Sequence, residues 1–309
     1  MMKKKLTYSI KLVERALTEC NISRENRAVL AFSGGIDSTC VLYLPPVLEA
    51  VKAGAIDLLF NDTLVEFPST RSFIMQLRDE LGANLIIAKP KMTFKDIVKQ
   101  YGFPIHPRGG RNYEKSKATN MCCYHLKKAP TKKVIREHNW CLYLTGLRAD
   151  ESYNRRIMAK QYGDYFDSKT YGHKKCHPIL HWSLDDVWAF QGSRGFKYNE
   201  LYDKVTYLND SEPDFSYENA KTFPVRTGCW CCPQGIRWGQ MKWLREHFPK
   251  MFKTLMLKMG LAEALLDLRI EKNMNVKSKR ALYMRDVNYK ELFGAARALE
   301  LHPCYFDSI

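Results

Sequence analysis

Short apolar runs alternate with longer segments of helical periodicity along the first half of the chain. Four runs predict strands, and they span residues 28–32, 56–60, 84–88 and 140–144. Between them, apolar residues recur at three- and four-residue spacing, most clearly over 68–81 and 93–101, which predicts helices. This alternation predicts an α/β fold in which a parallel sheet carries helices on both faces.

The two ends of the chain have a helical pattern of their own. Leu6, Ile10, Val13 and Leu17 predict an N-terminal helix within residues 1–26. Beyond Pro233 the pattern is helical and rich in Lys and Arg, which predicts a basic, mainly helical C-terminal segment over 236–309. A catalytic domain over 27–235 is expected between these two segments.

Prolines, glycines and polar residues interrupt the regular pattern. Pro45 and Pro46 should end the first crossover helix before residues 47–53, because proline donates no amide. Residues 106–121 are basic and rich in glycine, so we expect a loop that closes on an anion or stays solvated. Ser183, three residues before Asp186, predicts a helix N-cap. Residues 209–221 are polar and indicate a surface insertion.

Composition narrows the classes of partner. The chain has 309 residues, 45% of them hydrophobic, and a formal net charge of +16. This charge favours an adenine nucleotide, a nucleic acid or another polyanion as partner, although it also keeps a surface solvated. No run approaches the roughly 20 apolar residues of a membrane span. We therefore expect a cytoplasmic protein whose ten cysteines are ligands, nucleophiles or core residues rather than disulfides.

A Gly-rich turn follows the first predicted strand and opens a helix. It consists of Ser33, Gly34, Gly35, Ile36, Asp37, Ser38 and Thr39. Two glycines allow a tight turn and close approach of the backbone, while the serine hydroxyls and the first helical amides supply donors to a phosphate. The turn lacks the lysine of a P-loop and the spacing of GxGxxG. It predicts an anion site, and the alternative is a tight turn without a ligand.

Other polar residues should gather at the same edge, since ligands of parallel sheets bind beyond the carboxyl ends of the strands. Asp62 and Thr63 follow the second predicted strand, and Gly146 and Arg148 follow the fourth. The guanidinium groups of Arg148 and Arg155 suit phosphate or sulfate, whereas a solvated surface is their alternative role.

Half of the cysteines lie in two short stretches. These are Cys122 with Cys123, and Cys229, Cys231 and Cys232 in Cys-Trp-Cys-Cys-Pro. The pattern is typical of an iron-sulfur cluster, with Cys122, Cys123, Cys229 and Cys232 as the four thiolates. Zinc is the rival metal and a metal-free site the other alternative, while Cys231 competes as ligand or nucleophile.

Several motifs in order resemble those of the phosphoadenosine-phosphosulfate (PAPS) reductase family and the PP-loop ATP pyrophosphatase superfamily. Ser33–Ser38 is similar to SGGxDS, residues 61–70 to DTG...FPET, 145–155 to TGxRxxxS..R, and 181–203 to the segment W..xDVW...YNxLYD. The cysteines and Lys127 resemble those of cluster-containing adenosine-phosphosulfate (APS) reductases. Residues 226–233 resemble the GCWxC segment of the ATP pyrophosphatase of DNA phosphorothioation.

The resemblance implies a fold of the adenine-nucleotide α-hydrolase (PP-loop) type and a set of site residues. Asp37, Lys127, Arg148 and Arg155 are the implied catalytic residues. The implied nucleotide-binding residues are Ser33, Gly34, Gly35, Asp37, Ser38, Asp62, Thr63 and Gly146. The implied cofactors are a 4Fe-4S cluster, Mg²⁺ and ATP, or APS or PAPS in place of ATP.

Three functions follow from this resemblance. The first is ATP cleavage at the α-phosphate with release of pyrophosphate, coupled to iron-sulfur-dependent sulfur transfer to an acceptor such as nucleic acid, with a sulfur or electron donor protein. The second is reduction of APS or PAPS to sulfite. Reductases of the family carry a nucleophilic cysteine in a C-terminal ECG[IL]H motif, which this chain lacks, so Cys304 near His302 would have to serve. The third is a nucleotide-sensing module that binds nucleic acid without turnover.

Overall fold

The structure is a computed structural model that describes residues 2–105, 113–168, 172–206, 225–232, 235, 240–261 and 264. The chain divides into two compact units. Met1–Lys91 and His125–Leu201 form the first, and Met92–Tyr124 and Tyr202–Ile309 form the second. The domain boundaries expected at residues 26 and 235 stay predictions. The expected insertion at 209–221 and Cys304 lie outside the described residues.

A six-stranded sheet forms the centre of the first unit. Its strands are β1 (Ala28–Ala31), β2 (Ile56–Asn61), β3 (Leu85–Ala88), β4 (Leu142–Thr145), β5 (Tyr165–Ser168) and β6 (His173–Cys176). They lie in the order β3-β2-β1-β4-β6-β5. All neighbours are parallel except β5, which runs antiparallel to β6. The α/β class, the parallel sheet and the four expected strands are confirmed, and β5 adds one antiparallel strand at the edge.

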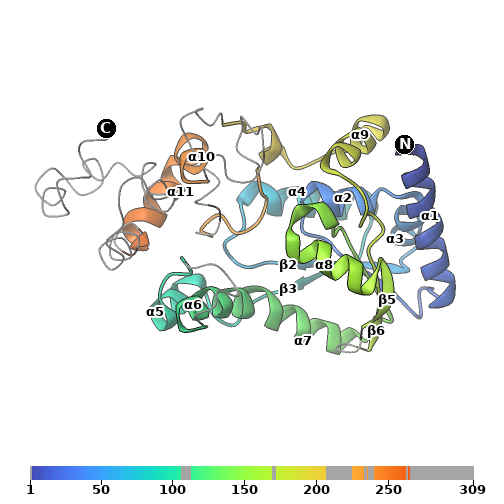
Figure 1. The fold of residues 1–309 in the computed structure, drawn as a ribbon, viewed down its shortest axis with the longest axis horizontal. Coiled ribbons are helices and arrows are strands. Elements are labelled where there is room, and N and C mark those ends of the chain that lie inside the picture. Colours follow the sequence, from blue (N-terminus) through green and yellow to red (C-terminus); the bar gives the residue numbers. More distant parts are fainter. Residues whose placement is uncertain are drawn as a thin grey trace, which may run out of the picture. The chain divides into compact units, whose positions relative to one another are not determined.

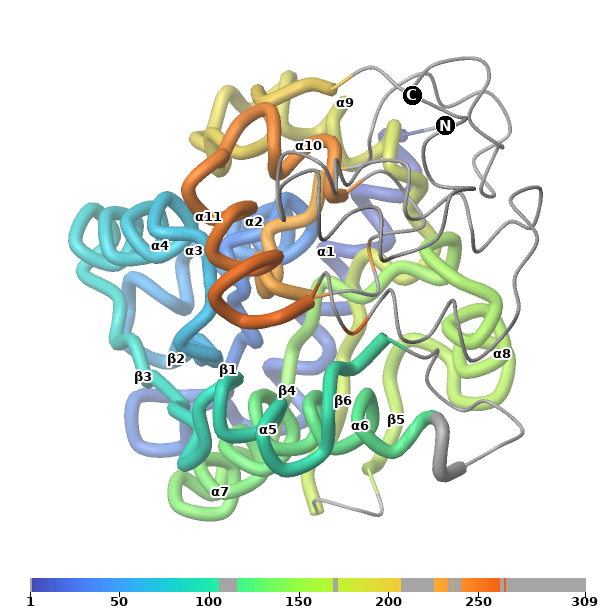
Figure 2. The backbone as a smooth tube through the Cα atoms, turned by 90° about the vertical axis from the view of Figure 1, so that its left-hand side faces the viewer, coloured from blue at the N-terminus to red at the C-terminus, as the bar shows by residue number. Residues whose placement is uncertain are grey.

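Helices lie on both faces of this sheet (Figures 1 and 2). The α-helices of the first unit are α1 (Met2–Glu19), α2 (Ile36–Leu42), α3 (Pro45–Lys52), α4 (Pro68–Leu81), α7 (Ala129–His138), α8 (Tyr153–Tyr162) and α9 (Leu184–Arg194). Pro45 stands in the first turn of α3, so the expected helix break is confirmed. The N-cap at Ser183 is also confirmed, since its side chain accepts the Asp186 amide in a capping box.

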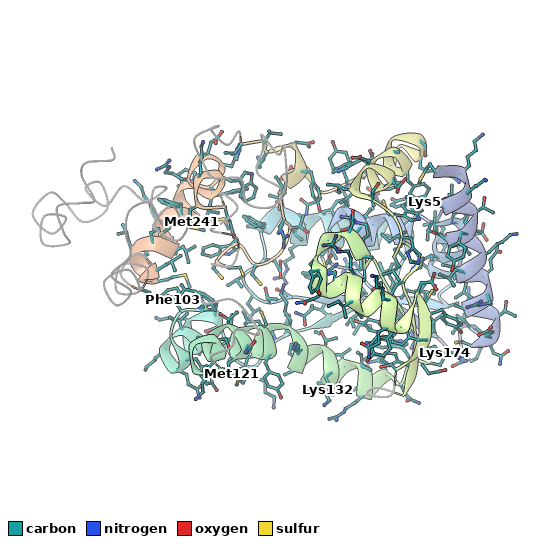
Figure 3. The ribbon with its side chains drawn as sticks, viewed as in Figure 1. Lys5, Phe103, Met121, Lys132, Lys174 and Met241 are labelled. Atoms are coloured by element: carbon teal, nitrogen blue, oxygen red, sulfur yellow. The ribbon has the colours of Figure 1, made fainter. Side chains whose placement is uncertain are left out.

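Alternation along β1 and β2 supplies both halves of the core. Val29 and Leu59 pack with Val134 and Ile135 of α7 on one face. Leu30 pairs in register with Leu58, and since successive strand residues point to opposite faces, both turn the other way. On that side α2 contacts β1 and α3 contacts β2. Figure 3 shows Lys132 of α7 pointing away from the sheet.

A buried carboxylate ties the amino ends of the strands together. Asp57 in β2 is completely buried and accepts hydrogen bonds from Trp140 Nε1 at 2.8 Å, Asn84 Nδ2 at 2.8 Å and Arg27 Nη1 at 2.9 Å. The donors precede β4, β3 and β1 respectively. A buried charge of this kind is tolerated because each oxygen has a donor. This edge of the sheet is a structural one, which leaves the carboxyl ends for chemistry.

The edge hairpin of β5 and β6 was not expected from the sequence. Its strands carry Asp167, Lys174 and Lys175 and bury little, so the alternation that marks a half-buried strand is weak. An ion pair between Lys174 and Asp167 links the two strands of the hairpin.

The second unit is helical in its described part. It contains α5 (Phe94–Tyr101), α6 (Tyr113–Cys123), α10 (Gln240–His247), α11 (Pro249–Lys253) and a π-helical turn, Thr254–Lys258. The loop expected over 106–121 is wrong from residue 113 onward, where α6 begins. Its buried residues are Ser116, Ala118, Thr119 and Cys122, which are small or polar and give no strong hydrophobic pattern. In the part of the chain that the structure describes, no helix is long and apolar enough to cross a membrane.

Candidate functional site

The Gly-rich turn between β1 and α2 is held by its own hydroxyl groups. Ser38 Oγ donates to the Gly35 carbonyl at 2.9 Å and lies 3.2 Å from Ser33 Oγ. The Gly35 amide donates to Ser33 Oγ at 3.3 Å. Gly34 has a φ of +69°, and a Cβ there would lie 2.9 Å from Ile74 Cγ1, so only glycine fits both constraints. The turn therefore has a defined shape without a ligand.

An ion pair joins this turn to the loop after β4. Arg148 Nε donates to Asp37 Oδ1 at 2.7 Å, and Arg148 Nη1 donates to Asp150 Oδ1 at 2.5 Å. The Arg148 side chain is 7% exposed and that of Asp37 25%. Burial raises the pKa of the Asp37 carboxyl, although Arg148 opposes the rise. Arg148 thus serves first to hold Asp37, and two of its nitrogens are already engaged.

Gly146 makes this approach of the two loops possible. A Cβ on Gly146 would lie 2.7 Å from the carbonyl carbon of Asp37 and 2.7 Å from the amide nitrogen of Ser38. Both are backbone atoms, so neither can move aside as a flexible side chain would. Gly146 therefore packs on the start of α2, and its expected contact with a nucleotide stays a proposal.

Arg155 occupies the first turns of α8, near the same loop. Ser152 caps the helix by accepting the Arg155 amide at 3.3 Å. The Arg155 guanidinium pairs with Glu151 four residues earlier. Burial raises the pKa of Glu151, and the Arg155 cation opposes the rise. Arg155 is 39% exposed, so its charge still reaches solvent.

Asp62, Thr63 and Glu66 form a second polar loop, after β2. Asp62 Oδ1 accepts the Leu64 amide at 3.0 Å, and Thr63 donates to Glu66 at 2.7 Å. Asp62 Oδ2 is buried and lies 3.2 Å from Arg71 Nη1, an ion pair without hydrogen-bond geometry. Burial raises the pKa of Glu66, and the Lys127 cation counters it. Lys127, an exposed residue, thus lies within electrostatic reach of this loop.

Asn199 is a supporting residue that the sequence did not single out. It is 1% exposed, and its Nδ2 donates to Thr70 Oγ1 at 2.9 Å and to the Gly34 carbonyl at 3.4 Å. The side chain ties the Gly-rich turn to the first turn of α4. Its place in the YNxLYD-like segment was the only available signal.

His177 is a second such residue. It follows β6, and its Nδ1 lies 2.7 Å from Thr145 Oγ1 at the end of β4. Nε2 is buried and has no hydrogen-bond partner among the described residues. Burial lowers the pKa of His177 to about 4, and the Lys175 and Arg155 cations act in the same direction against Asp164. His177 is therefore neutral at pH 7.

The cysteines of the second unit gather around Cys231. This thiol is completely buried, and burial raises its pKa, as do the neighbouring thiols of Cys229, Cys232 and Cys122. The Cys232 amide donates to the Cys229 carbonyl at 3.1 Å, which closes a tight turn. Cys123 is half-buried at the end of α6. Within the described residues, no group of three or more His, Cys, Asp or Glu side chains is arranged around one metal ion.

Comparisons with known proteins define the class of this chain. Residues 27–235 match the family model of the phosphoadenosine phosphosulfate reductase domain. Because the match covers more than half of this chain, the chain belongs to this family.

The relatives include enzymes of sulfur metabolism. Adenosine 5'-phosphosulfate reductase 1 of Bacillus subtilis is 28% identical over 213 residues, 66% of this chain and 80% of that protein. An uncharacterised protein of Methanocaldococcus jannaschii is 24% identical over 246 residues, 79% of this chain and 50% of that protein. The PAPS reductase of Candida auris, solved with phosphate, has a TM-score of 0.45 and 19% identity over 67% of this chain and 90% of that one.

Gly146→Ala should destabilise the first unit, because the added Cβ collides with the backbone at the start of α2. We expect the free energy of unfolding to fall by about 1 to 3 kcal/mol in denaturant titrations. Gly192→Ala in α9 is the matched control, since a Cβ there meets no atom within 4 Å. It should leave stability unchanged or raise it by up to about 1 kcal/mol. Equal stability of both variants would contradict the close packing at Gly146.

The buried His177 should make the fold sensitive to acid. Because its folded pKa of about 4 lies below the ordinary value of 6.5, the unfolded chain binds the proton first as pH falls. The contribution of neutral His177 to the free energy of unfolding is fully present above pH 6.5. It decreases by roughly 3 kcal/mol as the pH falls to about 4.

Two variants separate the effect of His177 on acid stability from the effect of carboxylate titration. His177→Asn keeps a hydrogen-bonding partner for Thr145 and should lose less stability between pH 7 and pH 4.5 than the parent protein, measured by urea unfolding. His181→Gln, at an exposed histidine, should follow the parent. Identical pH dependence in His177→Asn and the parent would show that His177 does not resist protonation.

Proposed function

We propose that this chain binds Mg–ATP at the Ser33–Ser38 turn and cleaves it between the α- and β-phosphates. An acceptor oxygen attacks the α-phosphorus, the bond from that phosphorus to the bridging oxygen breaks, and pyrophosphate leaves with the electron pair. Hydrosulfide then attacks the adenylated acceptor, such as a nucleic acid, a bond from the acceptor to sulfur forms, and AMP leaves with the electron pair.

Asp37 carries this proposal. Only its Oδ1 is engaged by Arg148, and Oδ2 has no hydrogen bond to a described residue. A carboxylate beside a phosphate-binding turn repels an anion unless a cation stands between them. Mg²⁺ suits this place, since it binds one or two carboxylates together with substrate phosphates. When bound, the ion would neutralise charge on the phosphates, and Asp37 would hold it.

Charged side chains in the neighbouring loops also support binding of Mg–ATP. Asp62 and Glu66 add carboxylates after β2, while Lys127 and Arg155 supply cations. Lys127 and Arg155 would neutralise charge that develops on the α-phosphate. Ser33, Gly34, Gly35 and Ser38 would cradle the phosphates, with Thr63 and Gly146 lining the site.

Asp37→Asn tests the metal-positioning role. Asparagine keeps an oxygen for Arg148 but loses the negative charge, so ATP affinity should no longer increase with Mg²⁺. In calorimetry, we expect at least a tenfold loss of ATP affinity in the presence of Mg²⁺, which is about 1.4 kcal/mol or more. In the absence of Mg²⁺ the affinity should change little. Asp150→Asn, which changes the other carboxylate bonded to Arg148, is the matched control. An unchanged Mg²⁺ response in Asp37→Asn would remove Asp37 from the metal site.

Sulfonucleotide reduction is the second candidate, favoured by the APS reductases among the relatives. A thiolate would attack the sulfur of APS or PAPS and displace AMP or its 3'-phosphorylated form. A second thiol would attack the bonded cysteine sulfur, so that sulfite leaves and the two thiols end as a disulfide. Cys304 is the only cysteine after Cys232 in the sequence. Anaerobic incubation with ATP, APS and PAPS separately distinguishes the two candidates, since the first yields pyrophosphate and the second sulfite. Binding without any product would support a nucleotide-sensing module instead.

A 4Fe-4S cluster is proposed for the cysteines of the second unit. The donor set fits, since several thiols gather around Cys231 in a buried environment. Each iron of such a cluster takes one thiolate, so the sulfurs need not surround a single ion. Cys122, Cys123, Cys229 and Cys232 would hold the cluster, which would supply a centre for sulfur or electron chemistry.

Anaerobically purified protein should contain about four irons per chain and show a brown colour. Cys→Ser substitution at Cys122, Cys123, Cys229 or Cys232 should abolish the iron, measured by metal analysis and visible absorption. Cys20→Ser, in the first unit, is the control and should keep it. Retention of iron in Cys232→Ser with loss in Cys231→Ser would move the ligand to Cys231. Stoichiometric zinc without iron would contradict the cluster.

A further inference from the structure

Asn61 is the last residue of β2 and stands directly before the Asp62–Glu66 loop. Its side chain makes two hydrogen bonds to a distant part of the chain. Nδ2 donates to the Leu126 carbonyl at 2.9 Å, and Oδ1 accepts from Thr131 Oγ1 at 3.1 Å. The carboxamide thus contacts the segment before α7 and the first turn of α7 itself.

A proline removes one α-helical donor from the segment before α7. In an α-helix, the Leu126 carbonyl would accept the amide of the fourth residue onward, which is Pro130. Proline has no amide hydrogen, and the chain makes a π-helical turn, Tyr124–Lys128, at this point. Asn61 Nδ2 supplies a side-chain donor to this carbonyl, whose α-helical partner would have been the proline. The side chain therefore acts as a clamp on both sides of Pro130.

Lys127 projects from the clamped turn. It follows Leu126 directly, and it is close enough to Glu66 to influence that carboxyl. Asn61 is therefore bonded to the backbone beside Lys127 and is covalently continuous with Asp62 and Thr63. A single side chain links the two parts of the edge that would meet a nucleotide.

We propose that Asn61 is a positioning residue that holds the π-helical turn so that Lys127 stands at the nucleotide's phosphates. This inference rests on the proposed function for the identity of the ligand. Asn61 itself need not touch the nucleotide. Its contribution to binding passes through Lys127, which distinguishes it from a residue that merely stabilises the sheet.

The first experiment needs no nucleotide. Hydrogen exchange followed by mass spectrometry should show faster exchange of peptides covering residues 124–131 in Asn61→Leu than in the parent protein. Asn84→Leu is the matched control, because Asn84 is also an asparagine bonded across the sheet, but to Asp57 at the amino ends. It should leave exchange at 124–131 unchanged. Unchanged exchange in Asn61→Leu would overturn the clamp.

A double-mutant cycle tests the action through Lys127. Affinities for ATP and for APS, each with Mg²⁺, are measured by calorimetry in the parent, Asn61→Leu, Lys127→Met and the double variant. Asn61→Leu should weaken binding about fivefold in the parent background and less than about twofold beside Lys127→Met. Thr131→Val removes one of the two hydrogen bonds and should produce a smaller loss of the same kind, which keeps the test available if Asn61→Leu folds poorly.

The outcomes separate the inference from the function on which it rests. An equal loss from Asn61→Leu in both backgrounds, or a loss of thermal stability with unchanged affinity, would overturn the positioning role. Absence of ATP and APS binding in the parent would overturn the proposed function and, with it, the nucleotide part of the inference. The exchange experiment would then still decide whether Asn61 clamps the turn.

Discussion

The buried ion pair between Arg148 and Asp37 is the interaction on which the candidate site depends. β1 and β4 are parallel neighbours, so the loops that follow them begin side by side. A guanidinium taken out of water requires compensation, and Asp37 and Asp150 provide it on two nitrogens. The pair links the two loops only because Gly146 presents no side chain to the start of α2. Removing Arg148 would leave the carboxylate of Asp37 without its cation, whereas removing Asp37 would leave Arg148 with Asp150 as its partner.

The rest of the edge is built around preformed polar contacts. Ser33 and Ser38 bond within their turn, and Asn199 holds the Gly34 carbonyl from another loop. Because these groups are already placed, a phosphate would meet donors that need little reorganisation. The carboxylates of Asp37, Asp62 and Glu66 repel a phosphate that binds without a cation. The proposed chemistry therefore includes a divalent cation. The opposite edge is occupied by Asp57 and its three donors and stays structural.

The second unit contains a group of buried and half-buried thiols. The buried residues of α6 include Ser116, Thr119 and Cys122, and other thiols lie near the buried Cys231. Large apolar side chains such as Trp243, Phe252 and Leu255 are also buried in this unit and supply hydrophobic stabilisation. Thiols collected in this way suit ligation of a metal, and metal-sulfur bonds would add to the stability of the unit. The chemistry of this unit therefore depends on what its cysteines bind.

Local patterns in the sequence were sufficient for the main elements. Apolar runs marked β1 to β4, and α4 was predicted over 68–81 because Pro68 starts it and apolar positions recur at helical spacing. The motifs that contain Ser33 to Ser38, Arg148 and the cysteine pairs could also be recognised from the sequence. The residues of each single motif lie close together in the chain. The β5–β6 hairpin and α6 were not predicted because polar residues form them, and their stability comes from neighbours rather than from periodicity.

Tertiary structure alone decided which residues act together. Nothing local indicates that Asp37 meets a guanidinium 111 residues away, that Asn199 supports Gly34, or that His177 bonds to Thr145. Asn61 and Leu126 are likewise 65 residues apart, and only the packing of α7 on the sheet brings them into contact. The sequence by itself determined the fold class and the reactive residue types, because these depend on short-range patterns. The pairing of charges and hydrogen bonds was left to the folded chain, because it depends on which strands lie side by side.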